Sequence, residues 1–330
     1  MAQTKISKET ILAEAVRVLE IEAQEIKALR DKIDDHFYKA VELISQCKGK
    51  VIVSGIGKSG QVGRKISSTF SSTGTPSVYL HPAETSHGDL GVITTGDLVL
   101  AISYGGESTE LSDLLSFVAR KEIPLIGMTG NKTSSLGKAS DVLLNIHVSA
   151  EACPMGLAPT SSTTATLAMG DALAMSVLKV RGFKEADFAE LHPGGKLGRK
   201  LLTRVKDLMH TGEEVALVDG DMPLREILPV MARGVRGVVG VVDKKGFLIG
   251  AVTDGDIRRR LLKSNPLEDI VKNVMSSNPK TIGPDELAER ALNQMEKLSL
   301  QCLFVADSAK DGTKPVGIIH FQDILKAKII

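Results

Sequence analysis

The chain has 330 residues, of which 42% are hydrophobic and 25% charged, a composition typical of globular proteins. A single core rarely grows to this length, so we expect two or three domains. The net charge is +1, without long blocks of either sign, and aromatic residues make up only 3%. These values argue against a nucleic-acid partner, whether a duplex or a stacked single strand.

The N-terminus and the cysteines indicate a cytoplasmic protein. The opening segment carries charges throughout and lacks the apolar run of a signal peptide. The longest uncharged stretch, residues 152–170, contains prolines and a run of hydroxyl residues, so no membrane span is expected. The three cysteines lie far apart with no CxxC spacing, which argues against a disulfide framework or a structural zinc site.

The first half of the chain predicts an α/β domain. Residues 7–46 carry apolar side chains at helical spacing and predict a long helix or a helix pair, outer or dimer-forming. Short β-branched runs then alternate with helical stretches, which predicts a parallel sheet covered on both faces by helices. These runs are residues 51–55, 77–80, 97–103, 123–129 and 141–146. A further helix is expected from Thr160 to about Arg181, and ligands should bind in the loops that follow the strands.

Beyond about residue 205 the chain repeats itself. Met209 corresponds to Met275 at an offset of 66 residues, and Asp256 to Asp323 at an offset of 67. A nearly constant offset indicates duplication of a small unit. Each copy resembles a CBS motif, a β-α-β-β-α unit that works in pairs.

Two glycine-rich loops are candidate anion sites. Residues 55–60 follow a strand and open a helix, so that backbone amides can approach a phosphate, although a tight turn would give the same pattern. The loop matches GxGxxG, but the second strand ends in Leu80-His81 rather than in the acid that a nicotinamide cofactor requires. In residues 103–109, hydroxyls and amides converge after the third strand. The alternative is that Ser108 simply caps the next helix.

Three further positions have side chains suited to acid–base chemistry. His81 and His87 share the loop after the second strand, where a single histidine is more often structural. His192 lies in a glycine-rich loop without apolar periodicity, so it is not expected in a core. Glu151 begins a nearly uncharged loop, and partial desolvation is expected to raise its pKa and suit it to be a general base. The alternative is a solvated loop acid.

The repeats carry a candidate ribose site. Thr253 and Asp256 place a hydroxyl and a carboxylate three residues apart at a strand-to-helix junction. The second copy has His320 in place of the threonine but keeps Asp323, so any nucleotide site is asymmetric.

Several segments in this order, followed by two CBS repeats, resemble the arabinose-5-phosphate isomerase family. They are GIGKSG, HPAETSHGDLG, ISYGGESTE, EACPMGLAPTSSTTATLAMGDALA and LHPGGKLGRKLL. The resemblance implies a SIS-type parallel five-stranded sheet sandwiched by helices, Rossmann-like, followed by a tandem CBS pair. It places the SIS domain at residues 1–204, with a core at about 40–184, and the CBS motifs at 205–267 and 271–330.

The family interconverts arabinose 5-phosphate and ribulose 5-phosphate through a cis-enediol, for Kdo of lipopolysaccharide or capsule, and its members are typically homotetramers. The resemblance implies catalytic roles for Lys58, Glu110, Glu151 and His192. It implies substrate contacts from Gly74, Thr75 and His87, beside the phosphate-loop residues Ser103, Ser108 and Thr109.

The resemblance also implies ligands beyond the sugar phosphate. His81 matches a position associated with a divalent metal, zinc, although the chemistry requires no cofactor. The CBS pair implies control by a nucleotide or by CMP-Kdo, through Thr253, Asp256 and Asp323.

The sequence differs from the family pattern at one position and leaves two alternative functions. Gly105 stands where many relatives have serine, so a hydroxyl that would contact the phosphate is lost. A SIS domain can also serve as a non-catalytic sugar-phosphate sensor, but no helix-turn-helix is evident. A nicotinamide oxidoreductase would rest on GIGKSG alone.

Overall fold

The computed structural model describes residues 7–234, 237–262, 267, 269–309 and 312–329. The chain divides into two compact units, Met1–Phe188 and Ala189–Ile330. Residues 189–204 group with the second unit. The domain boundary expected near residue 204 stays a prediction.

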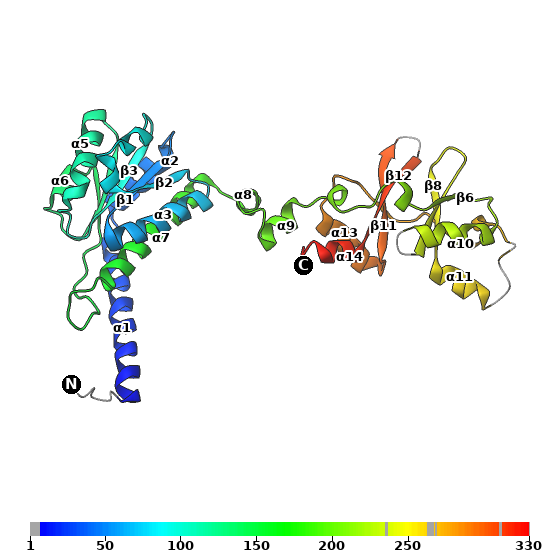
Figure 1. Ribbon diagram of the computed structural model, residues 1–330, viewed down its shortest axis with the longest axis horizontal. Coiled ribbons are helices and arrows are strands. Elements are labelled where there is room, and N and C mark those ends of the chain that lie inside the picture. The colour runs from blue at the N-terminus through cyan, green and yellow to red at the C-terminus, as the bar shows by residue number, and fades with distance from the viewer. Residues whose placement is uncertain (1–6, 235–236, 263–266, 268, 310–311, 330) are drawn as a thin grey trace. The chain divides into compact units, whose positions relative to one another are not determined.

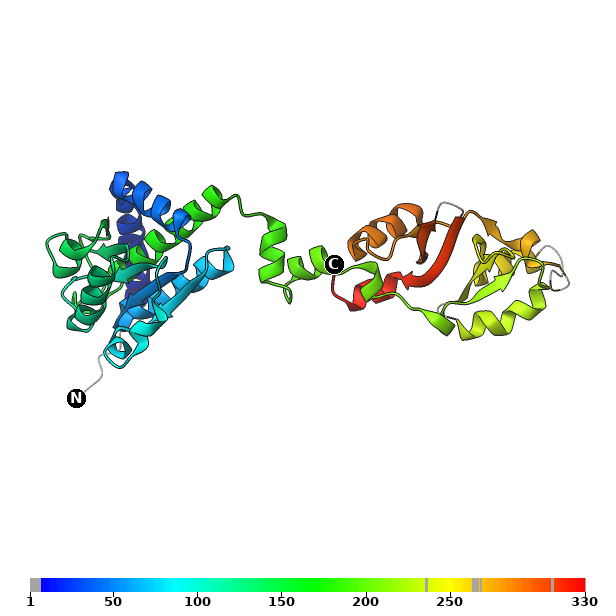
Figure 2. The same cartoon turned by 90° about the horizontal axis from the view of Figure 1, so that it is seen from above.

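The first unit is a parallel sheet covered by helices (Figures 1 and 2). Its strands are β1 (Val51–Gly55), β2 (Ser77–Leu80), β3 (Leu98–Ile102), β4 (Leu125–Thr129) and β5 (Val142–Asn145). Its helices are α1 (Lys8–Leu29), η1 (Arg30–Lys32), α2 (Asp35–Gln46), α3 (Gly57–Ser72), α4 (Pro82–Thr85), η2 (Asp89–Val92), η3 (Thr109–Leu111), α5 (Ser112–Lys121), α6 (Ser135–Ala139), α7 (Ser161–Arg181) and α8 (Glu185–Leu191), the last of which continues into the second unit. The expected α/β class and five-stranded parallel sheet are confirmed.

Alternation of side chains along the strands builds two cores. Val51 and Val53 of β1 pack with α2, α3 and α7 on one face, whereas Ile52 packs with α5 and α6 on the other. All pairs in this sheet are parallel, and the strand order is β2-β1-β3-β4-β5. The order reverses between β1 and β3, so a crevice opens where their carboxyl ends diverge.

The second unit holds the duplicated module. Its helices are α9 (Lys196–Leu202), η4 (Val205–Asp207), η5 (Gly212–Glu214), α10 (Leu224–Arg233), α11 (Asp254–Leu261), α12 (Val271–Val274), α13 (Ala288–Leu298) and α14 (Phe321–Lys326). Its strands are β6 (Leu217–Asp219), β7 (Val238–Val242), β8 (Leu248–Thr253), β9 (Ser276–Ser277), β10 (Thr281–Ile282), β11 (Cys302–Ala309) and β12 (Gly312–His320). In each copy a short strand pairs parallel with the first strand of an antiparallel hairpin, so the duplication read from the sequence is present in three dimensions.

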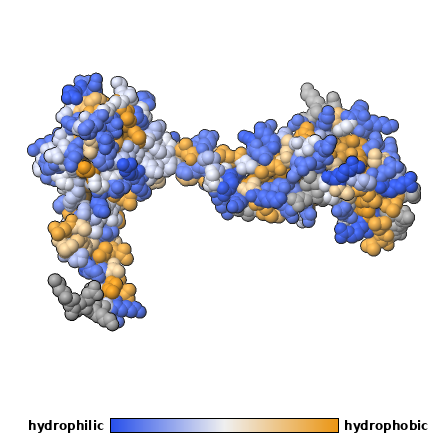
Figure 3. All heavy atoms as spheres, in the orientation of Figure 1, coloured by the Kyte–Doolittle hydropathy of each residue, from blue (hydrophilic) through white to orange (hydrophobic). Residues whose placement is uncertain are grey.

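Helix α1 packs on one side only. Five apolar residues, spaced alternately by four and three positions, lie on its exposed side: Leu12, Val16, Leu19, Ala23 and Ile26. Leu19 is 67% exposed, and hydrophobic side chains gather along this helix in Figure 3. Among the described residues no helix is both long enough and apolar enough to span a membrane. The spacing is that of a helix seam that packs against a second helix.

The turn from β1 into α3 depends on close backbone approach. A Cβ on Gly60 would lie 2.6 Å from the Tyr79 hydroxyl and 2.7 Å from the Gly55 carbonyl oxygen, and that hydroxyl donates to the same carbonyl at 2.6 Å. At Gly105 a Cβ would meet nothing within 4 Å. Only the first of these two glycines is required for packing.

We therefore expect Gly60→Ala to lower the free energy of unfolding by roughly 1–3 kcal/mol, the usual penalty for overpacking. Gly105→Ala is the matched control and should shift it by less than about 0.5 kcal/mol. Thermal denaturation of the full chain measures both. Equal midpoints for the two variants would contradict this reading of the turn.

Candidate active site

A cavity of about 460 Å³ opens at the crevice where the strand order reverses. It is lined by the loops that follow β1, β3 and β5 and by the first turns of α7. Among its lining residues are four of the predicted site residues, Lys58, Ser103, Ser108 and Glu151. A basic side chain, paired hydroxyls and a carboxylate thus share one space, as the sequence predicted from the loops after the strands.

Lys58 lies in the first turn of α3, and its side chain is exposed. The residue at the N-cap, Ile56, offers no side-chain hydrogen bond to this turn. Backbone amides in the first turn of a helix attract anions when the N-cap side chain does not bond to them. The Lys58 ammonium adds a full positive charge beside these amides. The arrangement suits a phosphate or a developing oxyanion.

The loop after β3 directs hydroxyls into the cavity. The Ser103 and Ser108 hydroxyls lie 2.9 Å apart, and Ser103 Oγ accepts from the Gly106 amide at 3.1 Å. Ser108 occupies the N-cap position of η3, but its side chain makes no capping hydrogen bond there. Gly105 lines the same cavity with open space around its α carbon, so the lost hydroxyl is not replaced by another side chain there.

Glu151 is half-buried and bonded to the start of α7. Its Oε2 accepts from the Thr160 amide at 2.8 Å, the Thr160 hydroxyl at 3.0 Å and the Ser162 amide at 3.3 Å. Burial raises the pKa of this carboxyl, but the hydrogen bonds from Ser162 and Thr160 outweigh it and hold the pKa below its ordinary value. The expected rise in the pKa of Glu151 is wrong, because the neutral loop supplies hydrogen-bond donors. The carboxylate is ionised at neutral pH, the form that can accept a proton.

Helix α1 anchors the segment that carries Glu151. Glu25, only 4% exposed, accepts from the Ser149 amide at 3.0 Å and the Ala150 amide at 3.2 Å. Arg17 donates to the Ala152 carbonyl oxygen at 2.6 Å. Neither residue was predicted from the sequence, although Glu25 falls on the inward stripe of α1 with Ile21, where a buried carboxylate is unusual.

Glu110 and Thr109 lie in η3 beside the cavity loop but are not among the residues that line it. Both are exposed, and the Thr109 hydroxyl donates to the Glu110 carboxylate at 3.4 Å. A substrate contact from either residue stays a prediction.

His81 and His87 lie in the loop after β2, outside the lining of the cavity. His81 Nδ1 accepts from the Ala83 amide at 3.3 Å and caps α4, and His87 is exposed. The described residues contain no group of three or more histidine, cysteine, aspartate or glutamate side chains that could hold a metal ion. His81 therefore belongs to no such group within the described part of one chain, and the residues do not fit a zinc site.

Gly74 and Thr75 precede β2, at the opposite edge of the sheet from Lys58. Gly74 has φ of +83°, and a Cβ there would lie 2.4 Å from the Phe183 ring. Thr75 is buried, and its hydroxyl has no hydrogen-bond partner within the described part of the chain. The structure does not bring these residues to the cavity within one chain, and their substrate contact stays a prediction.

His192 follows α8 and belongs to the second unit. It is half-buried, its amide donates to the Ala189 carbonyl oxygen, and its own carbonyl oxygen accepts from Gly195. A Cβ on Gly198 would lie 2.2 Å from that carbonyl oxygen, so the glycine-rich loop is needed for the turn. The catalytic role of His192 stays a prediction.

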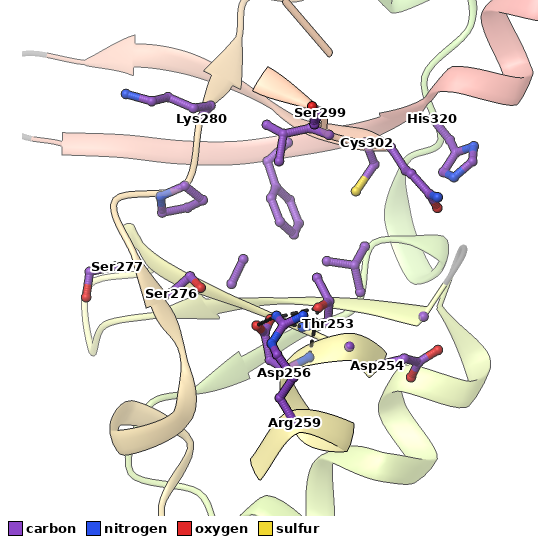
Figure 4. Close-up of a pocket in the computed structure, with 18 of the residues that line it drawn as sticks. Thr253, Asp254, Asp256, Arg259, Ser276, Ser277, Lys280, Ser299, Cys302 and His320 are labelled. Atoms are coloured by element: carbon purple, nitrogen blue, oxygen red, sulfur yellow. Dashed lines mark hydrogen bonds and ion pairs between the residues drawn. The ribbon is translucent and has the colours of Figure 1, made fainter. Parts of the chain in front are cut away.

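A second cavity, of about 780 Å³, lies within the second unit (Figure 4). Thr253 and Asp256 lie at the start of α11, and Arg259 pairs with Asp256 at 2.5 Å. His320 faces them from β12. The predicted ribose-type pair therefore does line a cavity, and Arg258 and Arg259 of α11 line it as well.

Comparison with known proteins decides the family. Residues 43–176 match the SIS domain family, and residues 205–263 and 271–329 match the CBS domain family. The arabinose 5-phosphate isomerase KdsD of Yersinia pestis is 47% identical over 315 residues, which are 95% of each chain. The chain belongs to the arabinose 5-phosphate isomerase family. The Pseudomonas aeruginosa KdsD of this family is 45% identical, over 96% of each chain.

A solved structure agrees with this assignment over more than half of the chain. An Escherichia coli CFT073 protein in complex with arabinose 5-phosphate is 34% identical and superposes with a TM-score of 0.55. The match covers 57% of this chain and 100% of that protein. The expected membership of the arabinose-5-phosphate isomerase family is confirmed.

Replacing Glu151 by glutamine should make the first unit less stable at neutral pH. The charge-assisted bonds to Thr160 and Ser162 then weaken, and we expect a loss of about 1–2 kcal/mol. The pKa of Glu151 in the folded protein lies below the ordinary 4.5. The stabilisation by its carboxylate is therefore complete at higher pH and is lost as the pH falls through that folded pKa. Denaturation of both proteins at a series of pH values measures it. A difference between them that grows as the pH falls would contradict the assignment.

Proposed function

We propose that the chain is an aldose–ketose isomerase that interconverts arabinose 5-phosphate and ribulose 5-phosphate. One observation carries the proposal: the Glu151 carboxylate, the Lys58 side chain and the serine loop after β3 line the same cavity at the strand-order switch. The curated relatives named for this reaction are aligned over nearly the whole chain. The product would supply Kdo for lipopolysaccharide or capsule.

The reaction moves one proton between neighbouring carbons. After the sugar ring opens, a base removes the proton from the carbon beside the carbonyl, which gives a cis-enediol, and returns it to the adjoining carbon while a second proton passes between the two oxygens. Glu151 is the base in this proposal, because its carboxylate is ionised and its position is fixed by hydrogen bonds to α7. His192, contributed by a neighbouring subunit, acts as the acid and base that opens the sugar ring.

The remaining side chains bind and orient the substrate. Ser103, Ser108 and the start of α3 hold the phosphate through hydroxyls and amides. Lys58 stabilises the oxyanion charge that develops on the enediol or anchors the phosphate, and Glu110 orients the sugar hydroxyls. Substrate contacts from Thr109, His87, Gly74 and Thr75 complete the proposal.

The CBS pair is the regulatory part of the proposal. Its cavity combines apolar walls with Thr253, Asp256 and basic side chains such as Lys280, a set that suits the base, ribose and phosphate of a nucleotide. The effector is therefore a nucleotide or a nucleotide sugar such as CMP-Kdo. The cytoplasm is the proposed location.

The chain is also proposed to form a homotetramer. The exposed stripe of α1, from Leu12 to Ile26, has the four-three spacing with which two copies of one helix pack together. Pairing of this helix would also bury the far side of the element that anchors Glu151 through Arg17 and Glu25.

The substrate is tested by assaying a panel of aldose and ketose phosphates for interconversion. We expect turnover of arabinose 5-phosphate and ribulose 5-phosphate, and a fall of about 10²–10⁴-fold in kcat for Glu151→Gln. Glu42→Gln, an exposed carboxylate of α2 outside the cavity, is the matched control and should keep wild-type turnover. No turnover of the pentose phosphates would overturn the proposed substrate. Near-normal kcat for a folded Glu151→Gln variant would overturn the base.

The assembly is tested by light scattering of Leu19→Glu against the wild type. A charge at the centre of the stripe should shift the protein to a smaller species, because a buried unpaired charge destabilises the seam. Gln24→Glu adds the same charge to the polar side of α1 and should leave the mass unchanged. A monomeric wild type, or a Leu19→Glu variant of unchanged mass, would refute pairing through α1.

A further inference from the structure

The two CBS copies begin their last helices in the same way. In the first copy, Thr253 caps α11 and the Asp256 carboxylate accepts from the Thr253 amide at 2.9 Å. In the second, His320 caps α14 and the Asp323 carboxylate accepts from the His320 amide at 3.2 Å. The aspartates therefore occupy equivalent places, and a symmetric pair would offer two equivalent sites.

The residue that pairs with the second strand of each antiparallel hairpin differs between the two copies. Ser276 of β9 pairs with Ala251 of β8, and His210 bridges to Ile318 of β12. These two pairs are equivalent, since 276 − 210 = 66 and 318 − 251 = 67, the offsets of the duplication. A small serine thus lines the cavity that contains Asp256, whereas an imidazole stands in the equivalent place near Asp323.

His210 is bonded directly to the second aspartate. Its Nε2 lies 3.1 Å from Asp323 Oδ2, and its Nδ1 lies 3.1 Å from Glu214 Oε2. Its backbone exchanges two hydrogen bonds with Ile318, at 2.8 and 3.0 Å, which fix the backbone at this position beside β12. The side chain that would hold a ribose in the second copy is therefore engaged by the protein itself.

Asp256 of the first copy is differently placed. It pairs with Arg259, whose side chain is 73% exposed, and both residues line the cavity of about 780 Å³. Figure 4 shows the pair with Thr253 at one wall, opposite Ser299, Cys302 and His320. An exposed arginine can turn from the carboxylate to a ligand phosphate without disturbing the backbone, because its long side chain is held only at its tip.

We infer that the CBS pair binds one nucleoside phosphate per chain, at the Asp256 cavity, and that His210 closes the equivalent place at Asp323. The inference rests on the proposed nucleotide effector and adds its stoichiometry and the residue that sets it. Ligand hydroxyls bond to Thr253 and Asp256, and the phosphate is held by Arg258, Arg259 and Lys280.

Calorimetric titration of the full chain with AMP and with CMP tests this. We expect one site per chain for at least one of the two nucleotides, with binding weakened at least tenfold by Asp256→Asn and unchanged by the matched variant Asp323→Asn. His210→Ser, which copies Ser276 into the second place, should raise the stoichiometry toward two. Far-UV circular dichroism checks that each variant is folded.

The ways in which the idea can fail are distinguishable. Two sites per wild-type chain, equal loss in the two aspartate variants, or one site in a folded His210→Ser variant would each overturn the role of His210 while the nucleotide effector stands. No binding of either nucleotide to any of the proteins would overturn the effector itself, and the inference with it.

Discussion

The geometry of the candidate active site depends on two carboxylates that hold one loop by hydrogen bonds. Glu25 of α1 binds the amides of Ser149 and Ala150 where the chain leaves β5, and Glu151 binds the amides of Thr160 and Ser162 where α7 begins. Buried amides need partners, and a carboxylate that accepts several of them holds the backbone in one arrangement. The position of the proposed base is thus set by α1 and α7 together rather than by the sheet alone.

The sheet contributes the place, and the loops contribute the chemistry. Reversal of strand order between β1 and β3 opens a crevice, and the loops after these strands bring Lys58 and the Ser103–Ser108 pair to it. The hydrogen bonds that fix Glu151 also keep its pKa low, so the proposed base is ordered and ionised but only modestly basic. An enediol mechanism then requires that the developing oxyanion be stabilised nearby, which is the role proposed for Lys58.

Periodicity and strand patterns predicted the sheet, the long helix ending at Arg181 and the duplicated module, because each has a strong local signal. Loop geometry was harder to predict. Glu151 looked desolvated because its neighbours in sequence are uncharged, yet backbone amides, which the sequence does not display, determine its pKa. Glu25 lies more than a hundred residues from the amides that it binds, and no local pattern indicates such a contact. The duplication predicted an asymmetric nucleotide site through His320, but the contact between His210 and Asp323 needed the structure.

In the proposed mechanism, Glu151 moves the proton between the two carbons of the substrate. Incorporation of deuterium from heavy water tests it at the reacting atom, with ribulose 5-phosphate and arabinose 5-phosphate followed by NMR. The wild type should label the carbon beside the carbonyl, and a folded Glu151→Gln variant should lose this exchange while still binding the sugar phosphate. Exchange at the wild-type rate in Glu151→Gln, with loss in Glu110→Gln or His87→Gln, would contradict it.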